Sequence, residues 1–254
     1  MSSNLVVMAA GDDSVLLKSW QGKQRNFDLF IVYFGINSNT ASRYQKMSDY
    51  FYRHSSVSKL ENVQEGLMQY DVLDKYDYYF IPDDDIDISV ENVELLFKIA
   101  KDHSLLICQP SCLGYPAIQR TRPVAGSLLR HVNFIEIMMP CFSRDALHKT
   151  LLTFSQNKTW GVDALWPFLL NNPERGLAII DAISGTHIRR PGTLYDRFYT
   201  NNIKPSKEIA SIENYLQKDL KRLGYGSLEH FIMIGKTFET VPLNLPLVFS
   251  DEQP

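Results

Sequence analysis

The hydrophobic residues of this chain fall into two patterns, short continuous runs and longer segments with a helical period. Over the first two-thirds of the chain, the short runs are rich in aromatic and β-branched residues and are bounded by Gly, Pro or Asp, which is typical of buried strands. The strands predicted in this way are 5–9, 27–34, 76–81, 105–108, a longer one at 132–142, and 176–183.

Helical segments follow several of these runs, and serines mark where they begin. Ser58 and Glu61 have the spacing of a capping box, and Ser89 and Ser143 precede two later segments in the same way. Gly224 follows the last helical stripe, as expected of a C-terminal stop. A shorter helix is expected at 162–170, and the inner faces of the longer ones carry Leu60, Val63 and Leu67; Val90, Val93, Phe97 and Ala100; and Ile209, Ile212, Leu216, Leu220 and Leu223.

Strands that alternate with helices predict an α/β domain with a Rossmann-like, mainly parallel mixed sheet and helices on both faces. We expect this domain to cover residues 1–190, and a mainly helical C-terminal extension, residues 191–254, to pack against it. Ligands of such sheets bind outside the carboxyl ends of the strands. A group of aspartates follows directly after the predicted strand 76–81, so its position and its chemistry agree.

The composition narrows the class of protein. With 254 residues and 44% hydrophobic content, the chain can bury one sizeable core, and 12% aromatic content argues against disorder. A net charge of −3 gives no basic surface for nucleic acid. No apolar stretch reaches the roughly 18–20 residues of a transmembrane segment, and no basic leader precedes the first strand. The odd cysteine count, with no C-x-x-C spacing, favours a reducing compartment, so we expect a cytoplasmic protein.

Four carboxylates stand within five residues, at Asp83, Asp84, Asp85 and Asp87. Two such charges about 4 Å apart repel by roughly 4 kcal/mol at an effective dielectric constant of about 20. A divalent cation removes this repulsion, because hard cations prefer oxygen ligands. The simpler alternative is a solvated acidic turn in which Asp87 favours the N-terminus of the next helix.

An EF-hand is a second interpretation of the same residues. Asp83, Asp85, Asp87 and Glu94 match ligand positions 1, 3, 5 and 12 of such a loop. Position 6 is Ile88, where the sharp turn requires Gly, and the preceding segment is a predicted strand rather than a helix. We therefore take this match as accidental.

A phosphatase of the haloacid dehalogenase type is a third interpretation. Asp85, Asp87 and Ser89 fit its D-x-D-x-[ST] nucleophile loop. Such a fold normally begins with that loop, whereas here two predicted strands come first. It also needs a downstream acidic pair, where this chain supplies Asp181 alone. This interpretation stays open as an alternative.

The segment YDYYFIPDDDIDIS resembles the D-x-D region of glycosyltransferases of the GT-A fold, in which an apolar strand runs into the two aspartates. The order of motifs is similar to that of the glycosyltransferase-like proteins grouped as domain-of-unknown-function family 707. The matching segments cover about half of the chain and are the Asp triplet, VNFIEIMMPCFSR at 132–144, WGVDALW at 160–166 and LAIIDAISGTH at 177–187. The resemblance implies a GT-A fold, a nucleotide-sugar donor and a Mn²⁺ or Mg²⁺ ion, and it does not identify the acceptor.

For the metal, the resemblance implies Asp85 as the first ligand, at the last position of the D-x-D. Asp83 would bind the metal, through a water molecule, or the donor's ribose. His187 takes the place of a C-terminal histidine that often completes the metal site in GT-A enzymes, and an imidazole ligand favours Mn²⁺ over Mg²⁺. The alternative for His187 is an ordinary loop histidine.

For the donor, the expected contacts come from Asp83, Asp84, Lys59, Ala10 and Arg189. The loop that begins at Ala10 should lie near the nucleotide base, by analogy with GT-A donors. Lys59 resembles a lysine that family members carry before their second helix, and it would contact phosphate. Arg189 could pair with diphosphate oxygens, or it could be solvated.

For the acceptor, Asp163 and Glu136 are the candidates. Asp163 lies between Trp160 and Trp166, whose indole faces could cover the apolar face of a sugar ring, and its carboxylate could take the proton of the attacking hydroxyl. The alternative is a helix-start acid between two core tryptophans. Glu136 lies among apolar residues, where its ionised form is costly without a partner, so it is either an acceptor-site group or a structural one.

The sequence thus predicts a metal-dependent glycosyltransferase that moves a sugar from a nucleotide-diphosphate-sugar donor, such as a UDP- or GDP-sugar, to a carbohydrate or other hydroxyl acceptor. Whether the reaction inverts or retains configuration stays open. The alternatives are a non-catalytic relative that binds nucleotide or carbohydrate, and the phosphatase described above. Nucleotidyl transfer is disfavoured, because the loop after the first strand is acidic rather than Gly-rich and basic.

Overall fold

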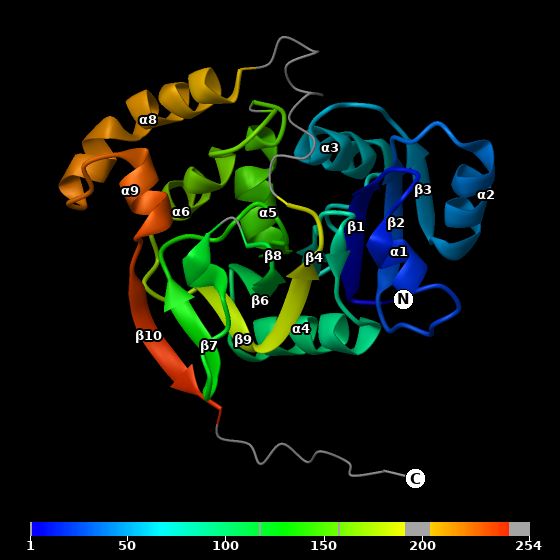
Figure 1. The fold of residues 1–254 in the computed structure, drawn as a ribbon, viewed down its shortest axis with the longest axis horizontal. Coiled ribbons are helices and arrows are strands. Elements are labelled where there is room, and N and C mark those ends of the chain that lie inside the picture. Colours follow the sequence, from blue (N-terminus) through cyan, green and yellow to red (C-terminus); the bar gives the residue numbers. More distant parts are fainter. Residues whose placement is uncertain (1, 117, 157, 191–203, 244–254) are drawn as a thin grey trace.

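A mixed β-sheet forms the centre of the computed structural model, which describes residues 2–116, 118–156, 158–190 and 204–243 (Figure 1). Within these residues the sheet has ten strands, in the order β10-β7-β9-β6-β8-β4-β1-β2-β3, with β5 paired to β9. The strands are β1 (Asn4–Ala10), β2 (Asp28–Tyr33), β3 (Tyr50–Arg53), β4 (Tyr78–Phe80), β5 (Ile86–Asp87), β6 (Ile107–Gly114), β7 (Ser127–Val132), β8 (Cys141–Ser143), β9 (Leu177–His187) and β10 (Thr237–Pro242).

The strand directions bring several carboxyl ends to one edge of the sheet. Strands β3, β2, β1 and β4 are parallel, and so are β6 and β9. Strand β8 lies between β4 and β6 and is antiparallel to both, so the two parallel groups point the same way. Strands β5, β7 and β10 add antiparallel pairs. The sheet is therefore partly parallel, where the sequence had predicted a mainly parallel one.

Helices cover both faces of this sheet, as predicted. Alternate residues of β1 point to opposite sides: Val6 and Met8 pack with residues of α1, α2 and α4, whereas Leu5 and Val7 pack with residues of α3, α5 and α6. The helices are α1 (Val15–Ser19), α2 (Ser38–Met47), α3 (Lys59–Tyr70), α4 (Val90–Asp102), α5 (Arg144–Thr150), α6 (Trp166–Leu169), α8 (Pro205–Arg222) and α9 (Leu228–Met233).

The predicted helix starts are confirmed by their hydrogen bonds. Ser58, Ser89 and Ser143 each accept a bond from the backbone N–H three residues further on. Each bond satisfies one of the N–H groups that a helix leaves unpaired in its first turn. Gly224 has φ +84°, a conformation that favours glycine, and follows the end of α8 as predicted.

Two predicted elements are wrong in their extent. The strand expected at 132–142 is divided: β7 ends at Val132 and β8 begins at Cys141. Residues 133–140 are as apolar as a strand but form a buried connection, bonded to side chains from elsewhere in the chain. The helix expected at 162–170 is a 3₁₀ turn, Val162–Ala164, followed by the single turn of α6.

The C-terminal part packs on the rest of the protein through a separate apolar cluster. It joins Ile212, Leu216 and Phe231 of α8 and α9 to Phe134 and Ala164. The part is not only helical, however, because β10 extends the central sheet beside β7. Residues 191–203, where the predicted boundary falls, lie outside the described residues. No helix in the described part of the chain is long and apolar enough to cross a membrane.

Candidate active site

The aspartate triplet lies directly after β4, and three other segments hold its backbone. The Asp83 N–H donates to the Met138 carbonyl at 2.8 Å, and the Asp84 carbonyl accepts from the Val15 N–H at 2.8 Å. The Asp85 carbonyl accepts from the Ile188 N–H, just after β9, at 3.2 Å. Each aspartate is therefore fixed relative to a different element, at the edge where the parallel strands end.

Asp85 and His187 face each other across this edge, although they are far apart in the sequence. The Asp85 Oδ2 lies 3.3 Å from the His187 Nε2, and the two side chains are 11% and 8% exposed. The His187 Nδ1 lies 2.8 Å from the Tyr115 carbonyl oxygen. An oxygen acceptor at Nδ1 places a proton there, so Nε2 is the nitrogen available to a metal.

The charge on His187 depends on what lies beside Nε2. Burial alone would lower the pKa of His187, but the Asp85 carboxylate and the Tyr115 carbonyl outweigh it and raise that pKa. Without a cation, the Asp85 carboxylate therefore favours the protonated form of His187. With a divalent cation, the same oxygen and nitrogen are the donor types that suit Mn²⁺ or another transition metal.

Asp85 and His187 give the candidate metal site two protein side chains as ligands. Among the described residues, no three His, Cys, Asp or Glu side chains are grouped so that they could hold a metal ion. Mg²⁺ sites in phosphate chemistry usually use one or two carboxylates, completed by substrate phosphates and water. Asp85 and His187 offer one carboxylate and one imidazole, a set that suits a transition metal better than Mg²⁺.

Asp83 is paired with Lys59, and the charges of Asp85 and His187 also act on it. The Lys59 Nζ lies 2.6 Å from the Asp83 Oδ1, and the Asp83 side chain is 34% exposed. The second carboxylate oxygen is thus the one that Asp83 can offer to a ligand. The Lys59 side chain is largely buried against the protein.

Asp84 joins the loop after β1 to the end of β9. Its Oδ2 accepts from the Gly11 N–H at 2.9 Å, and its Oδ1 lies 3.5 Å from Arg189 Nη1. Burial raises the pKa of Asp84 to about 6. Both oxygens therefore already have partners, and Asp84 supports the loop. Ala10 and Gly11 are both buried, so the part of that loop that solvent reaches begins at Asp12.

Arg189 is the cation beside the aspartates. Its Nη1 lies 3.8 Å from the Asp85 Oδ2, and its Nη2 donates to the Asp13 carbonyl at 3.1 Å. The side chain is 31% exposed, so its guanidinium can still reach an anion. Arg190 turns elsewhere and stacks over the Tyr115 ring at 5.5 Å.

Asp163 and Glu136 lie on a second side of the site, and both are buried. One Asp163 oxygen, Oδ2, accepts from the Ile137 N–H at 3.0 Å. The other oxygen, Oδ1, and the Glu136 Oε2 are buried without a hydrogen-bond partner. Such atoms are costly in a folded protein and require an explanation. Neither atom touches solvent, so a ligand reaches them only after covering groups move.

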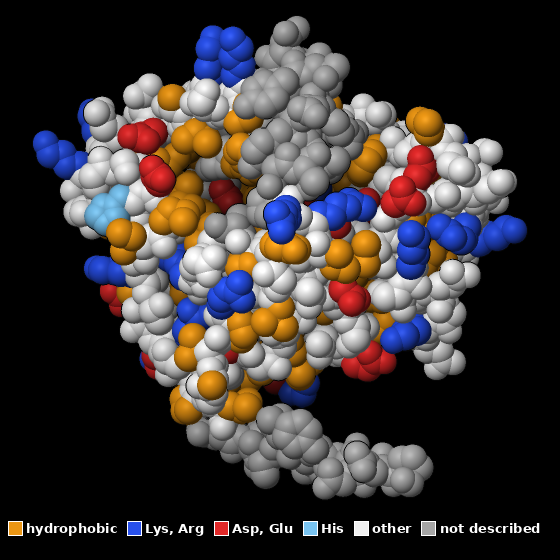
Figure 2. Space-filling view, in the orientation of Figure 1, with side chains coloured by type: hydrophobic (Ala, Val, Ile, Leu, Met, Phe, Trp, Pro, Cys, Tyr) orange, Lys and Arg blue, Asp and Glu red, His pale blue; other side chains and the backbone are white. Residues whose placement is uncertain are grey.

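The two acids influence each other's protonation. Burial, with the negative charges of Asp163 and Asp83, raises the pKa of Glu136 to about 8. Burial raises the pKa of Asp163 to about 6. At neutral pH Glu136 is therefore mainly neutral and Asp163 mainly ionised, a division that suits one hydrogen-bond donor and one base. Figure 2 shows a recess in the molecular surface beside the C-terminal helices.

The two tryptophans differ in their surroundings. Trp166 is fully buried, packs on Phe142 and Phe154, and donates from Nε1 to the Thr153 Oγ1 at 3.2 Å. It belongs to the core, so it cannot form a sugar platform. Trp160 is half-buried and stays a candidate.

Three residues of the site were not predicted from the sequence. The Gln109 Oε1 accepts from the Glu136 N–H at 2.7 Å, and an amide within an apolar strand was the available signal. Tyr115 contributes only its backbone carbonyl, which no side-chain motif can reveal. Arg120 stacks over the Phe134 ring at 5.0 Å, and burial lowers its pKa to about 10, although the charges of Glu136 and Asp163 oppose that shift.

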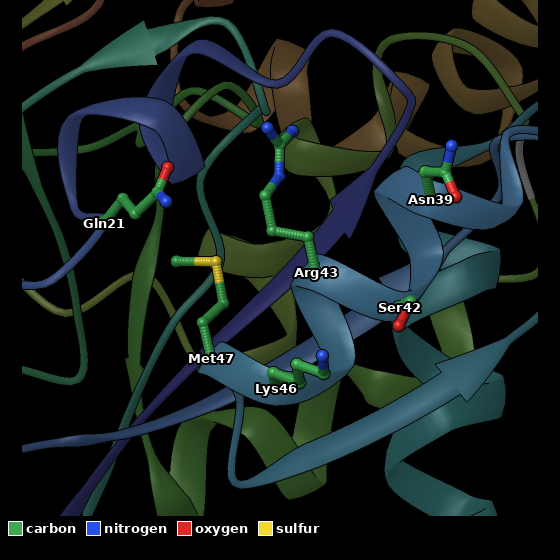
Figure 3. Close-up of a pocket in the computed structure, with 6 residues that line it drawn as sticks. All are labelled: Gln21, Asn39, Ser42, Arg43, Lys46 and Met47. Carbon is green, nitrogen blue, oxygen red and sulfur yellow. The ribbon is translucent and has the colours of Figure 1, made fainter.

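A pocket lies between α2 and the segment just after α1 (Figure 3). It is lined by Gln21, Asn39, Ser42, Arg43, Lys46 and Met47, and by none of the predicted site residues. Its lining includes two cationic side chains, Arg43 and Lys46, and no carboxylate, so it does not suit a metal ion.

No known protein family matches the chain, and no curated protein shows significant sequence similarity to it.

Glu136 makes the stability of the protein depend on pH. The unfolded chain loses this proton near pH 4.5, whereas the folded protein keeps it up to about 8. Between these values the folded state binds more protons, so the free energy of unfolding falls as pH rises, by about 1.4 kcal/mol per unit. Glu136→Gln cannot ionise, so we expect it to be more stable than the wild type at pH 8, with the difference shrinking towards pH 5.

Urea unfolding of both proteins at these two pH values measures this difference. Glu65→Gln, at an exposed position of α3, is the matched control and should follow the wild type. Equal pH slopes for the wild type and Glu136→Gln would show that Glu136 ionises normally in the folded protein.

Proposed function

We propose that this protein is a metal-dependent glycosyltransferase of the GT-A class, acting on a nucleotide-diphosphate-sugar such as a UDP- or GDP-sugar. One observation carries the proposal: the Asp85 Oδ2 and His187 Nε2 lie 3.3 Å apart at the sheet edge where the parallel strands end. This is where ligands of such sheets bind. The motif resemblance to domain-of-unknown-function family 707 supports the same class.

In this proposal the site stabilises a leaving diphosphate. Asp85 and His187 hold the metal, which supplies Lewis-acid charge stabilisation when bound. Arg189 adds a fixed cation beside them, with its guanidinium able to bond phosphate oxygens. Asp83 would offer its second carboxylate oxygen to the ribose or to the metal site. Asp84 and Gly11 hold the loop on which the nucleotide base would rest.

The acceptor would bind on the side of Asp163 and Glu136. There, Asp163 takes the proton of the attacking hydroxyl, and neutral Glu136 donates a hydrogen bond to the sugar. The acceptor O–H bond breaks as the bond from that oxygen to the sugar C1 forms, and the bond from C1 to the diphosphate oxygen breaks. The unpartnered oxygens of both acids support this assignment.

The phosphatase alternative finds less support. It needs Asp85 as a free nucleophile with Asp87 beside it as an acid. Asp85 is instead buried against His187, and Asp87 is exposed on β5. A non-catalytic nucleotide-binding relative differs from the proposal in a measurable way, because it would bind nucleotide without metal.

We also propose that the protein works in the cytoplasm. The three cysteines are free and buried, which agrees with a reducing compartment. The experiment that tests the proposed function is the binding of nucleotide diphosphates with and without Mn²⁺, which is set out at the end of the Discussion.

A further inference from the structure

The ammonium group of Lys59, the first residue of α3, is surrounded by oxygen atoms. The Lys59 Nζ lies 2.6 Å from the Asp83 Oδ1. It also donates to the carbonyls of Ile137 at 2.5 Å, Met138 at 3.1 Å and Ile81 at 3.3 Å. An ammonium has only three N–H donors, so these four oxygens use all of them. The side chain is 15% exposed.

Two of the three carbonyls around Lys59, those of Ile137 and Met138, belong to the segment 136–138, which also contacts the other candidate residues. Ile137 is bonded at both ends: its N–H donates to the Asp163 Oδ2 at 3.0 Å, and its carbonyl accepts from Lys59. The Met138 carbonyl accepts from Lys59 and from the Asp83 N–H. One short segment thus connects Asp83, on the donor side, to Asp163, on the acceptor side.

We propose that Lys59 is a positioning residue that sets Asp83 for the donor and the segment 136–138 for the acceptor. This inference rests on the proposed function. It differs from the role expected from the sequence, in which Lys59 contacts phosphate directly. Because its donors are all used by the protein, Lys59 acts on the ligands through Asp83 and through the segment.

The chemistry of lysine suits this place. Removing the ammonium leaves Asp83 beside Asp85 without its nearest cation, and like charges at short range repel. It also leaves buried carbonyl oxygens without their donor, which is costly. Arginine is a poor substitute, because its planar fork cannot converge on oxygens that come from several directions.

The first test compares Lys59→Met with Lys46→Met. Lys46 is exposed on α2 and lies outside the site, so its variant controls for the loss of one positive charge. Calorimetric titration with UDP and with GDP, in Mn²⁺, gives the affinity of each protein. We expect about 10–100-fold weaker nucleotide binding for Lys59→Met, the usual cost of losing a group that supports a metal site. Lys46→Met should bind as the wild type does.

The second test restores the ammonium. Lys59→Cys treated with bromoethylamine carries a side chain of nearly the length and charge of lysine, and the three native cysteines are buried and thereby protected. We expect the treated variant to recover most of the wild-type affinity and the untreated one to stay weak. Lys59→Gln, which keeps N–H donors but has no charge, should also stay weak, and it serves if Lys59→Met does not fold.

The outcomes separate this inference from the proposed function. If the wild type binds nucleotide with Mn²⁺, but Lys59→Met and Lys59→Gln bind equally well and only melt at a lower temperature, Lys59 is merely structural and the inference is overturned. Failure of bromoethylamine to restore binding contradicts it as well. A wild-type protein that binds no nucleotide with Mn²⁺ overturns the proposed function, and the inference with it.

Discussion

Replacing Asp85 by asparagine is expected to abolish Mn²⁺-dependent nucleotide binding while the protein stays folded. Asp85 supplies the buried carboxylate that faces His187, and the neutral amide of asparagine is a poor metal ligand. The loss should exceed the roughly 10–100-fold that removal of a supporting contact costs. The fold should persist, because the Asp85 backbone keeps its bond from Ile188, and the lost attraction to His187 and Arg189 is offset in part by weaker repulsion within the aspartate triplet.

The matched control is Asp87→Asn. It removes the same charge two residues further on, from an exposed side chain. Titration calorimetry gives the affinities, and thermal unfolding reports whether both variants fold. An Asp85→Asn protein that melts far below the wild type and still binds nucleotide with metal would make Asp85 a structural residue.

Replacing Asp163 by asparagine is expected to slow sugar transfer by about 10²–10⁴-fold, the range for loss of a general base. Affinity for metal and nucleotide should stay near that of the wild type. The side-chain oxygen of asparagine can still accept the Ile137 N–H bond, so the segment 136–138 keeps its place. The measurement is the release of nucleotide diphosphate from the donor, first with water and then with a panel of sugar acceptors.

Asp145→Asn is the control, since Asp145 is an exposed acid in the first turn of α5. The split between kcat and KM then decides the role of Asp163. A raised acceptor KM with an unchanged kcat would indicate hydroxyl binding without proton transfer. Loss of donor binding, or transfer at the wild-type rate with unchanged KM, would remove Asp163 from the acceptor side.

Local signals in the sequence were sufficient for much of the fold. The serine caps at Ser58, Ser89 and Ser143 each bond an N–H only three residues away, so neighbouring residues are enough to predict them. The strand at 5–9 is buried on both faces, and its continuous apolar run indicates this in the sequence. The prediction of a strand across 133–140 was wrong, because the hydrogen-bond partners of this segment are distant in the sequence. Gln109, Asp163 and Lys59 supply the bonds that a neighbouring strand would have made.

The sequence named candidate site residues, and the structure shows how they are arranged. That Asp85 and His187 meet was expected from the motif resemblance, and the geometry brings them together. The sequence could not show that Asp84 turns back to Gly11 or that Lys59 is saturated by protein oxygens. Both contacts join residues that are distant in the sequence, and the residue type alone does not show whether a lysine is exposed or buried.

The most direct test of the central claim is calorimetric titration of the wild-type protein with UDP and GDP, in Mn²⁺ and in excess chelator. The Asp85–His187 pair cannot by itself bind an anionic diphosphate, because the carboxylates around it repel the negative charge of the diphosphate. A divalent cation removes this repulsion. We therefore predict measurable binding of at least one nucleotide diphosphate with Mn²⁺ and none with chelator. Equal binding under both conditions, or binding of neither nucleotide with Mn²⁺, would contradict the claim that this edge of the sheet is a metal-dependent nucleotide-sugar site.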